Sequence, residues 1–171
     1  EDLWILISSG AYGEETGLTG KRNLHHWLVD PHDGTSAFQR GFRGTAISVA
    51  LLRGVEPVLG VVLAPCPPVG DEDLITWAEG CGPVQRNGLQ VERRWPTELD
   101  DRVVVLVSQD ADTKPTANLR MVHPARFLAV ASVAYRMALT GAGEGDVGVS
   151  LAPTLDYDFA AAHAIIKGAG G

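Results

Sequence analysis

The sequence predicts an α+β protein built on an antiparallel sheet. Short runs rich in Val, Ile and Leu fill the first two thirds of the 171 residues, and helical patterns follow in the last third. The links between neighbouring runs are too short for the crossovers that parallel strands require. An apolar fraction of 45% and a charged fraction of 20% are typical of a folded globular chain.

The first expected strands flank a glycine-rich segment. Residues 3–8 form a short apolar run that predicts a strand, and residues 10–20, with four glycines, predict a loop. Residues 25–30 are strand-like, and this strand is expected to end near Asp30 because a proline follows.

A series of hairpins is expected next. A short polar stretch between two runs rich in Val, Ile and Leu predicts one hairpin, and Asn87-Gly88 is typical of another hairpin turn. The strands expected in this region are residues 45–52, 58–63, 74–78, 89–92 and 103–108.

The last third predicts two helices around a short strand. Residues 125–139 are free of proline and end shortly before a glycine, which predicts a helix, while residues 147–151 are strand-like. Residues 156–167 are rich in alanine, with acids at the start and a lysine at the end, so a second helix is expected. A weak linker signal divides the chain into residues 1–97, with the metal and phosphate loop, and residues 98–171.

Charge and cysteine usage exclude several classes of protein. Fourteen Lys and Arg against 21 Asp and Glu give a net charge of −7, which disfavours nucleic acid as a partner. No apolar run approaches the roughly 18 residues of a membrane span, and no signal peptide is evident. Cys66 and Cys81 do not form a secreted disulfide framework, so both are expected to be free thiols in a cytoplasmic protein.

Three familiar patterns are rejected from their context. The G-x-G-x-x-G at residues 143–148 follows a helix and precedes a strand-like run, the reverse of the dinucleotide fingerprint, so we expect a helix-capping loop. Gly20-Lys21 lacks the first glycine and the Ser or Thr of a phosphate-binding P-loop. His25 and His26 would face opposite sides of a strand, so they are poorly placed to share a metal.

The stretch D-P-H-D-G-T at residues 30–35 carries the chemistry. Its glycine allows a sharp turn, so the carboxylates of Asp30 and Asp33 can converge with the carbonyl of His32 on one hard cation such as Mg²⁺. The backbone N–H groups of Gly34 and Thr35 can point into the same space and donate hydrogen bonds to a phosphate oxygen. An ordinary turn capped by aspartate is the alternative interpretation of these residues alone.

This stretch resembles the D-P-[ILM]-D-G-T signature of the inositol monophosphatase superfamily, which hydrolyses phosphate monoesters using Mg²⁺. Further motifs of that family are similar to G-E-E at residues 13–15, G-V-V-L-A-P at 60–65 and Y-D-F-A-A at 157–161, followed by A-G-G at 169–171. The resemblance implies the layered α/β/α/β sandwich of the inositol monophosphatase and fructose-1,6-bisphosphatase type, incomplete at both termini.

The resemblance also implies roles for individual residues. Four carboxylates at about 4 Å spacing repel by roughly 4 kcal/mol per pair at an effective dielectric near 20, so such a cluster needs cations. One Mg²⁺ would be bound by Glu14, Asp30 and the carbonyl of His32, and a second by Asp30, Asp33 and Asp158. Glu14 and Thr35 would position the attacking water. The phosphorylated substrate would be contacted by Asp33, Gly34, Thr35 and Ser36.

The chain departs from the family pattern. The family has a longer segment before G-E-E, with two helices and an Asp that orients the water, and it continues beyond A-G-G, so we expect a part of a larger polypeptide or a truncated copy. Ser150 and Leu151 stand where an inositol-binding Glu is expected, and P-T-L-D-Y-D at 153–158 resembles the branch that removes the 3′-phosphate from adenosine bisphosphate. Asp156 is expected to be a helix cap and Glu15 a solvated acid.

The leading hypothesis is a Mg²⁺-dependent phosphomonoesterase that acts on a small phosphorylated substrate such as an inositol or sugar phosphate. The alternatives are an adenosine 3′,5′-bisphosphate 3′-phosphatase and a degenerate module that binds metal or a phosphorylated ligand without turnover. By resemblance the chain is expected to form a homodimer or to belong to a larger polypeptide, without nucleic acid or membrane as a partner.

Overall fold

The computed structural model describes residues 10–13, 17–19, 24–151 and 153–171. Its larger sheet runs in the order β2-β1-β3-β4-β5-β6-β7-β8 and is antiparallel except where β1 pairs with β3. The strands are β1 (Gly10–Gly13), β2 (Gly17–Thr19), β3 (His25–Asp33), β4 (Ala46–Arg53), β5 (Glu56–Ala64), β6 (Asp73–Ala78), β7 (Gln85–Arg86) and β8 (Leu89–Gln90).

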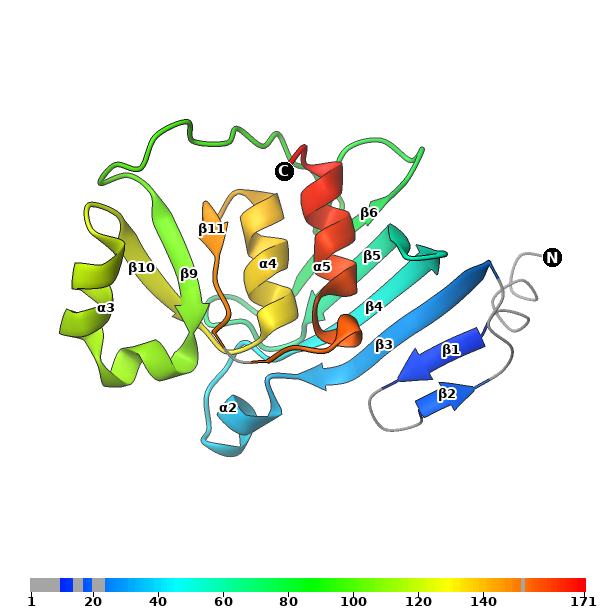
Figure 1. Cartoon of the computed structure of the whole chain (residues 1–171), viewed down its shortest axis with the longest axis horizontal. Coiled ribbons are helices and arrows are strands. Elements are labelled where there is room, and N and C mark those ends of the chain that lie inside the picture. The colour runs from blue at the N-terminus through cyan, green and yellow to red at the C-terminus, as the bar shows by residue number, and fades with distance from the viewer. Residues whose placement is uncertain (1–9, 14–16, 20–23, 152) are drawn as a thin grey trace.

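A smaller sheet of parallel strands lies at the other end of the molecule (Figure 1). Its order is β10-β9-β11, with bounds Arg126–Val130, Val104–Ser108 and Val147–Gly148. The helices are α2 (Thr35–Gln39), the 3₁₀-helix η1 (Gln109–Thr113), α3 (Pro115–Val122), α4 (Val133–Ala142) and α5 (Asp156–Gly168). No helix among the described residues is long and apolar enough to cross a membrane.

Helices α4 and α5 lie side by side on one face of the larger sheet, and α4 also packs on the smaller sheet (Figure 1). The core between them holds side chains with no exposed surface, among them Val62, Ile75, Leu106 and Ile165. Gly60 of β5 allows the closest approach: a Cβ there would lie 2.0 Å from the carbonyl oxygen of Ala161 in α5. The α+β layered fold expected from the sequence is confirmed.

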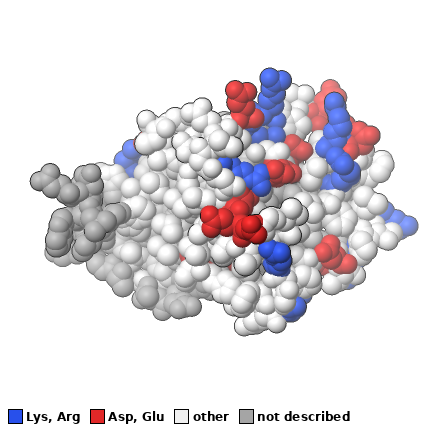
Figure 2. Space-filling view, turned by 180° about the vertical axis from the view of Figure 1, so that it is seen from behind, with Lys and Arg blue, Asp and Glu red and all other residues white. Residues whose placement is uncertain are grey.

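The opposite face of the larger sheet is also apolar, and none of the described helices packs on it. Successive side chains of a strand point to opposite faces, so Leu59 and Val61, on either side of Gly60, point away from α5. Residues directly opposite each other on paired strands share a face, so the partners of Leu59 and Val61 on β4 and β3 point away from α5 as well. Figure 2 views this side and shows a broad area free of charged side chains beside the grey residues. The partly exposed side chains on this face are Trp27, Val29, Ile47, Val49, Leu51, Leu59, Val61, Leu63 and Leu74.

Several expected strands and turns are confirmed. The hairpin of β4 and β5 forms as expected, and Asn87-Gly88 joins β7 to β8 with both φ angles positive, as such a turn requires. Helix α5 occupies the segment expected, and Gly143 ends α4 in the left-handed conformation, so the G-x-G-x-x-G segment caps a helix. Cys66 and Cys81 are free and exposed.

Other expectations are wrong. Residues 10–20 contain β1 and β2, and the strand expected to end near Asp30 continues to Asp33. The helix expected over residues 125–139 is β10 followed by α4, because residues 126–130 pair with β9 in the smaller sheet. That sheet is parallel, with α3 supplying one of its crossovers, whereas only antiparallel pairing was expected. The strand expected at residues 3–8 lies outside the described residues, and the division at residue 97 stays a prediction.

Candidate active site

A bulge at the end of β3 brings two aspartates to the buried side of the strand. Asp30 pairs with Ser48 and Asp33 with Ala46, so three steps on β3 match two on β4. Without this extra residue, side chains three apart would point to opposite faces. Asp30 and Asp33 are instead both buried, 2% and 8% exposed.

Local hydrogen bonds fix the loop that follows. The Asp30 carboxylate accepts the backbone N–H of His32 at 2.8 Å, and the Thr35 hydroxyl donates to the His32 carbonyl at 2.8 Å. Gly34 has φ 93°, and a Cβ there would lie 3.3 Å from both the Ser132 nitrogen and a Thr45 methyl. Both the backbone conformation and the close packing therefore favour glycine at this position.

The N-terminus of α4 holds Asp33. Asp33 Oδ2 accepts the Ser132 hydroxyl at 2.5 Å and the Ala134 N–H at 2.6 Å, and no hydrogen bond to Oδ1 is made by the described residues. Burial raises the pKa of Asp33 above its ordinary value, and the charge of Asp158 raises it further. The bonds from Ser132 and Ala134 and the charge of Arg136 lower the pKa without cancelling the effect of burial. Asp33 therefore carries a charge that the metal-free protein stabilises only in part.

Asp158 comes from the first turn of α5. Its carboxylate accepts the backbone N–H of Leu155 at 2.7 Å, which fixes the start of the helix. Leu155, and not Asp156, is the N-cap residue, so the expectation for Asp156 is wrong. The carbonyl of Tyr157 accepts the Ser48 hydroxyl at 3.2 Å and ties this turn to β4.

One cavity of about 360 Å³ collects these groups. Almost all the site residues expected from the sequence line it: Asp30, His32, Asp33, Gly34, Thr35, Ser36 and Asp158. Glu14 lies outside the described residues. Within the described part of the chain, no three His, Cys, Asp or Glu side chains are arranged so that they could hold a metal ion. The carboxylate and carbonyl oxygens fit Mg²⁺ in chemical type, and the expected set is short of Glu14.

Ser132, which hydrogen-bonds to Asp33, and Arg136, which lines the cavity, are among the residues not expected from the sequence. The Ser132 hydroxyl donates to Asp33. Serine is typical of the N-cap position that Ser132 occupies, but it was missed because the helix was predicted to begin several residues earlier. Arg136 is 2% exposed, and its Nη1 donates to the Val130 carbonyl at 2.7 Å. Its other guanidinium N–H groups have no acceptor among the described residues, so this buried cation has donors to offer to the cavity it lines.

Two sheets with helices packed on them, and an acidic cavity where β3, α4 and α5 meet, define a layered α+β protein. A family model described as the inositol monophosphatase family matches residues 6–171. The chain belongs to this family, as the resemblance in its motifs implied.

Relatives of known sequence and structure agree with this assignment. The chain is 31% identical over 147 residues to the 3′(2′),5′-bisphosphate nucleotidase CysQ of Salmonella typhimurium, which covers 85% of this chain and 56% of that protein. The IMPase of Thermotoga maritima has a TM-score of 0.77 at 26% identity, and the extragenic suppressor protein suhB of Bartonella henselae has 0.75 at 26%. These alignments cover 98% and 96% of this chain but 63% of each neighbour. The chain thus spans less than two thirds of these relatives.

Proposed function

We propose that the protein is a Mg²⁺-dependent phosphomonoesterase that hydrolyses a small phosphorylated substrate such as an inositol or sugar phosphate. One observation carries the proposal: Asp30, Asp33 and Asp158, from segments far apart in the sequence, line a single cavity with the loop at residues 34–36. Membership of the inositol monophosphatase family supports the same chemistry.

The carboxylates of Glu14, Asp30, Asp33 and Asp158, with the carbonyl of His32, would hold the metal ions. Bound Mg²⁺ supplies a water of lowered pKa and neutralises charge on the phosphate oxygens. Asp33 is suited to this role because Oδ2 takes both of its hydrogen bonds and Oδ1 takes none from the described residues.

The loop contributes groups that bind and orient. The Thr35 hydroxyl donates its hydrogen bond to the His32 carbonyl, so its oxygen is left to accept a hydrogen bond from a water. The backbone N–H groups of Thr35 and Ser36 belong to the first turn of α2, where they have no acceptor within the helix. They are therefore suited to donate to a phosphate oxygen.

Phosphate release in the presence of Mg²⁺ tests the proposal, with inositol 1-phosphate and fructose 1,6-bisphosphate as substrates. Asp158→Asn is expected to remove nearly all turnover. The control is Arg53→Gln, which breaks the exposed ion pair of Arg53 with Glu79 far from the cavity and is expected to leave turnover unchanged. Release that persists in Asp158→Asn would contradict the role of this residue. Mg²⁺ binding without release from any substrate would favour the non-catalytic module.

A second candidate, an adenosine 3′,5′-bisphosphate 3′-phosphatase, is favoured by Arg136. Its free N–H donors line the cavity, and a guanidinium is suited to a second phosphate group. The bisphosphate nucleotidase CysQ is among the relatives of this chain. If this candidate is correct, Arg136→Met lowers kcat/KM for the bisphosphate at least tenfold more than for inositol 1-phosphate. An equal loss for both substrates would contradict it.

A further inference from the structure

A buried aspartate outside the cavity accepts hydrogen bonds from three side chains of two separate segments. Asp73, on β6, is 3% exposed, and its carboxylate accepts the Tyr135 hydroxyl at 2.6 Å. The Arg86 side chain donates to both carboxylate oxygens, at 2.8 and 2.9 Å, and Asn87 adds a bond at 3.2 Å. A buried charge with this many donors is well satisfied and holds its partners in place.

The same tyrosine belongs to the helix turn that holds Asp33. The Tyr135 backbone N–H donates to the Ser132 hydroxyl oxygen at 2.8 Å, and that hydroxyl donates to Asp33. The N–H of Ala134, one residue earlier, donates to Asp33 directly. Tyr135 is therefore anchored to Asp73 through its side chain while its backbone helps to support the two donors of Asp33.

We propose that Asp73, acting through Tyr135, is a positioning residue that sets the geometry of Asp33 in the candidate metal site; this inference rests on the function proposed above. The first turn of a helix is where helices fray, because its N–H groups lack partners within the helix. The two hydrogen bonds to Asp33 Oδ2 come from this first turn of α4, so they fix the orientation of the carboxylate only while the turn itself is held in place. Supporting hydrogen bonds of this kind tune metal affinity by roughly 10–100-fold in metalloproteins.

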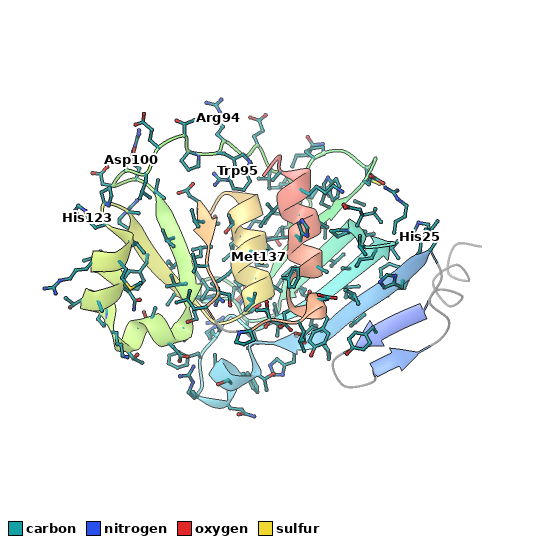
Figure 3. The ribbon with its side chains drawn as sticks, in the orientation of Figure 1. His25, Arg94, Trp95, Asp100, His123 and Met137 are labelled. Carbon is teal, nitrogen blue, oxygen red and sulfur yellow. The ribbon has the colours of Figure 1, made fainter. Side chains whose placement is uncertain are left out.

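The alternative is that the Asp73 network only stabilises the fold, and a matched pair of variants separates the two. Tyr135→Phe removes the hydroxyl that Asp73 accepts and keeps the ring. Trp95→Phe likewise removes one aromatic donor, the indole N–H that binds the Ala169 carbonyl at 2.9 Å near the end of α5 (Figure 3). Circular dichroism and thermal unfolding would establish that both variants fold and that both lose stability.

The readouts are Mn²⁺ affinity, followed by electron paramagnetic resonance of the free ion, and hydrogen exchange of the Ala134 amide. Tyr135→Phe is expected to weaken Mn²⁺ binding about tenfold and to accelerate exchange at Ala134, whereas Trp95→Phe changes neither. If Tyr135→Phe does not fold, Arg86→Lys takes its place, because it keeps the charge beside Asp73 but loses the bidentate hydrogen bond. A smaller loss of Mn²⁺ affinity and a smaller acceleration of Ala134 exchange are then expected.

The failures are distinguishable. Wild-type protein that binds no Mn²⁺ would overturn the metal site, and with it the role of Asp73 toward a metal. Normal Mn²⁺ binding by the wild type with unchanged affinity and unchanged Ala134 exchange in Tyr135→Phe would overturn the positioning role alone. Equal weakening in Tyr135→Phe and Trp95→Phe would mean that general loss of stability, and not the anchor, lowers the affinity.

Discussion

The carboxyl group of Asp33 is buried next to Asp158, and its hydrogen bonds come from the first turn of α4. Burial disfavours its ionised form, while the proposed role as a metal ligand requires that form. In the metal-free protein the raised pKa means that the folded state holds its proton to a higher pH than the unfolded state. The contribution of Asp33 to stability therefore falls as the pH rises from about 3.9 through the raised pKa.

Asp33→Asn is expected to raise the unfolding free energy of the metal-free protein at pH 7, because an amide can accept the same two hydrogen bonds without a buried charge. The variant should also lose most of the stabilisation by Mg²⁺, which for one site is about 2.7 kcal/mol at 100 times the dissociation constant. Thermal unfolding at pH 4–8, with EDTA and with Mg²⁺, measures both effects. A variant that gains as much from Mg²⁺ as the wild type would contradict this assignment.

Asp73 shows the opposite pH behaviour. Burial alone would raise its pKa, but the bonds from Arg86, Tyr135 and Asn87 outweigh burial and hold the pKa below its ordinary value. Its stabilisation is therefore present above about pH 3.9 and is lost as the pH falls through the lowered pKa. Asp73→Asn is expected to cost about 2 kcal/mol at pH 7 and to flatten the loss of stability below pH 4. Chemical denaturation at pH 2.5–7 checks this, and equal slopes in variant and wild type would contradict it.

At the scale of elements, the sequence predicts those helices, turns and hairpins that depend on residues close together in the chain. The extent of α5, the Asn87-Gly88 turn and the hairpin of β4 and β5 are encoded by nearby residues, and all three were predicted. The bulge in β3 and the strand β10 depend on pairing with β4 and β9, which a single run of sequence does not show.

The candidate site divides in the same way. The motif at residues 30–35 identifies its own loop, and the structure brings Asp158 to it. Ser132 and Arg136 could not be found in advance, because the start of α4 was placed several residues too early. An arginine within an expected helix carries no sign that it will be buried beside a distant loop.

The contact of β5 with α5 gives a prediction about an element. Gly60→Ala places a Cβ 2.0 Å from the Ala161 carbonyl oxygen, and the obstacle is backbone, so the helix has to move. A destabilisation of about 3 kcal/mol or more is expected, within the upper range for overpacked cores. Val61→Ala, one residue along on the other face of β5, is the control and should cost clearly less because its side chain is partly exposed. Urea denaturation measures both, and a Gly60→Ala cost below that of Val61→Ala would contradict the close packing.

At the scale of the whole molecule, the site exists because helices α4 and α5 are packed side by side on one face of the larger sheet. Their N-termini then reach the end of β3, and residues about 100 positions apart in the sequence meet around one cavity. The other face of that sheet is apolar in every central strand, which is unusual for an antiparallel sheet exposed to water.

This open face gives the last prediction. Leu51 and Leu59 are paired on it and are partly exposed, so the protein is expected to bind the apolar dye ANS there. Replacing both by threonine keeps strand propensity and should lower ANS fluorescence clearly, with less than about 1 kcal/mol lost per site because little burial is given up. Val69→Thr, at an isolated apolar side chain that is 88% exposed, is the control and should leave the fluorescence unchanged. Undiminished ANS binding in the double variant would show that the face is covered in solution.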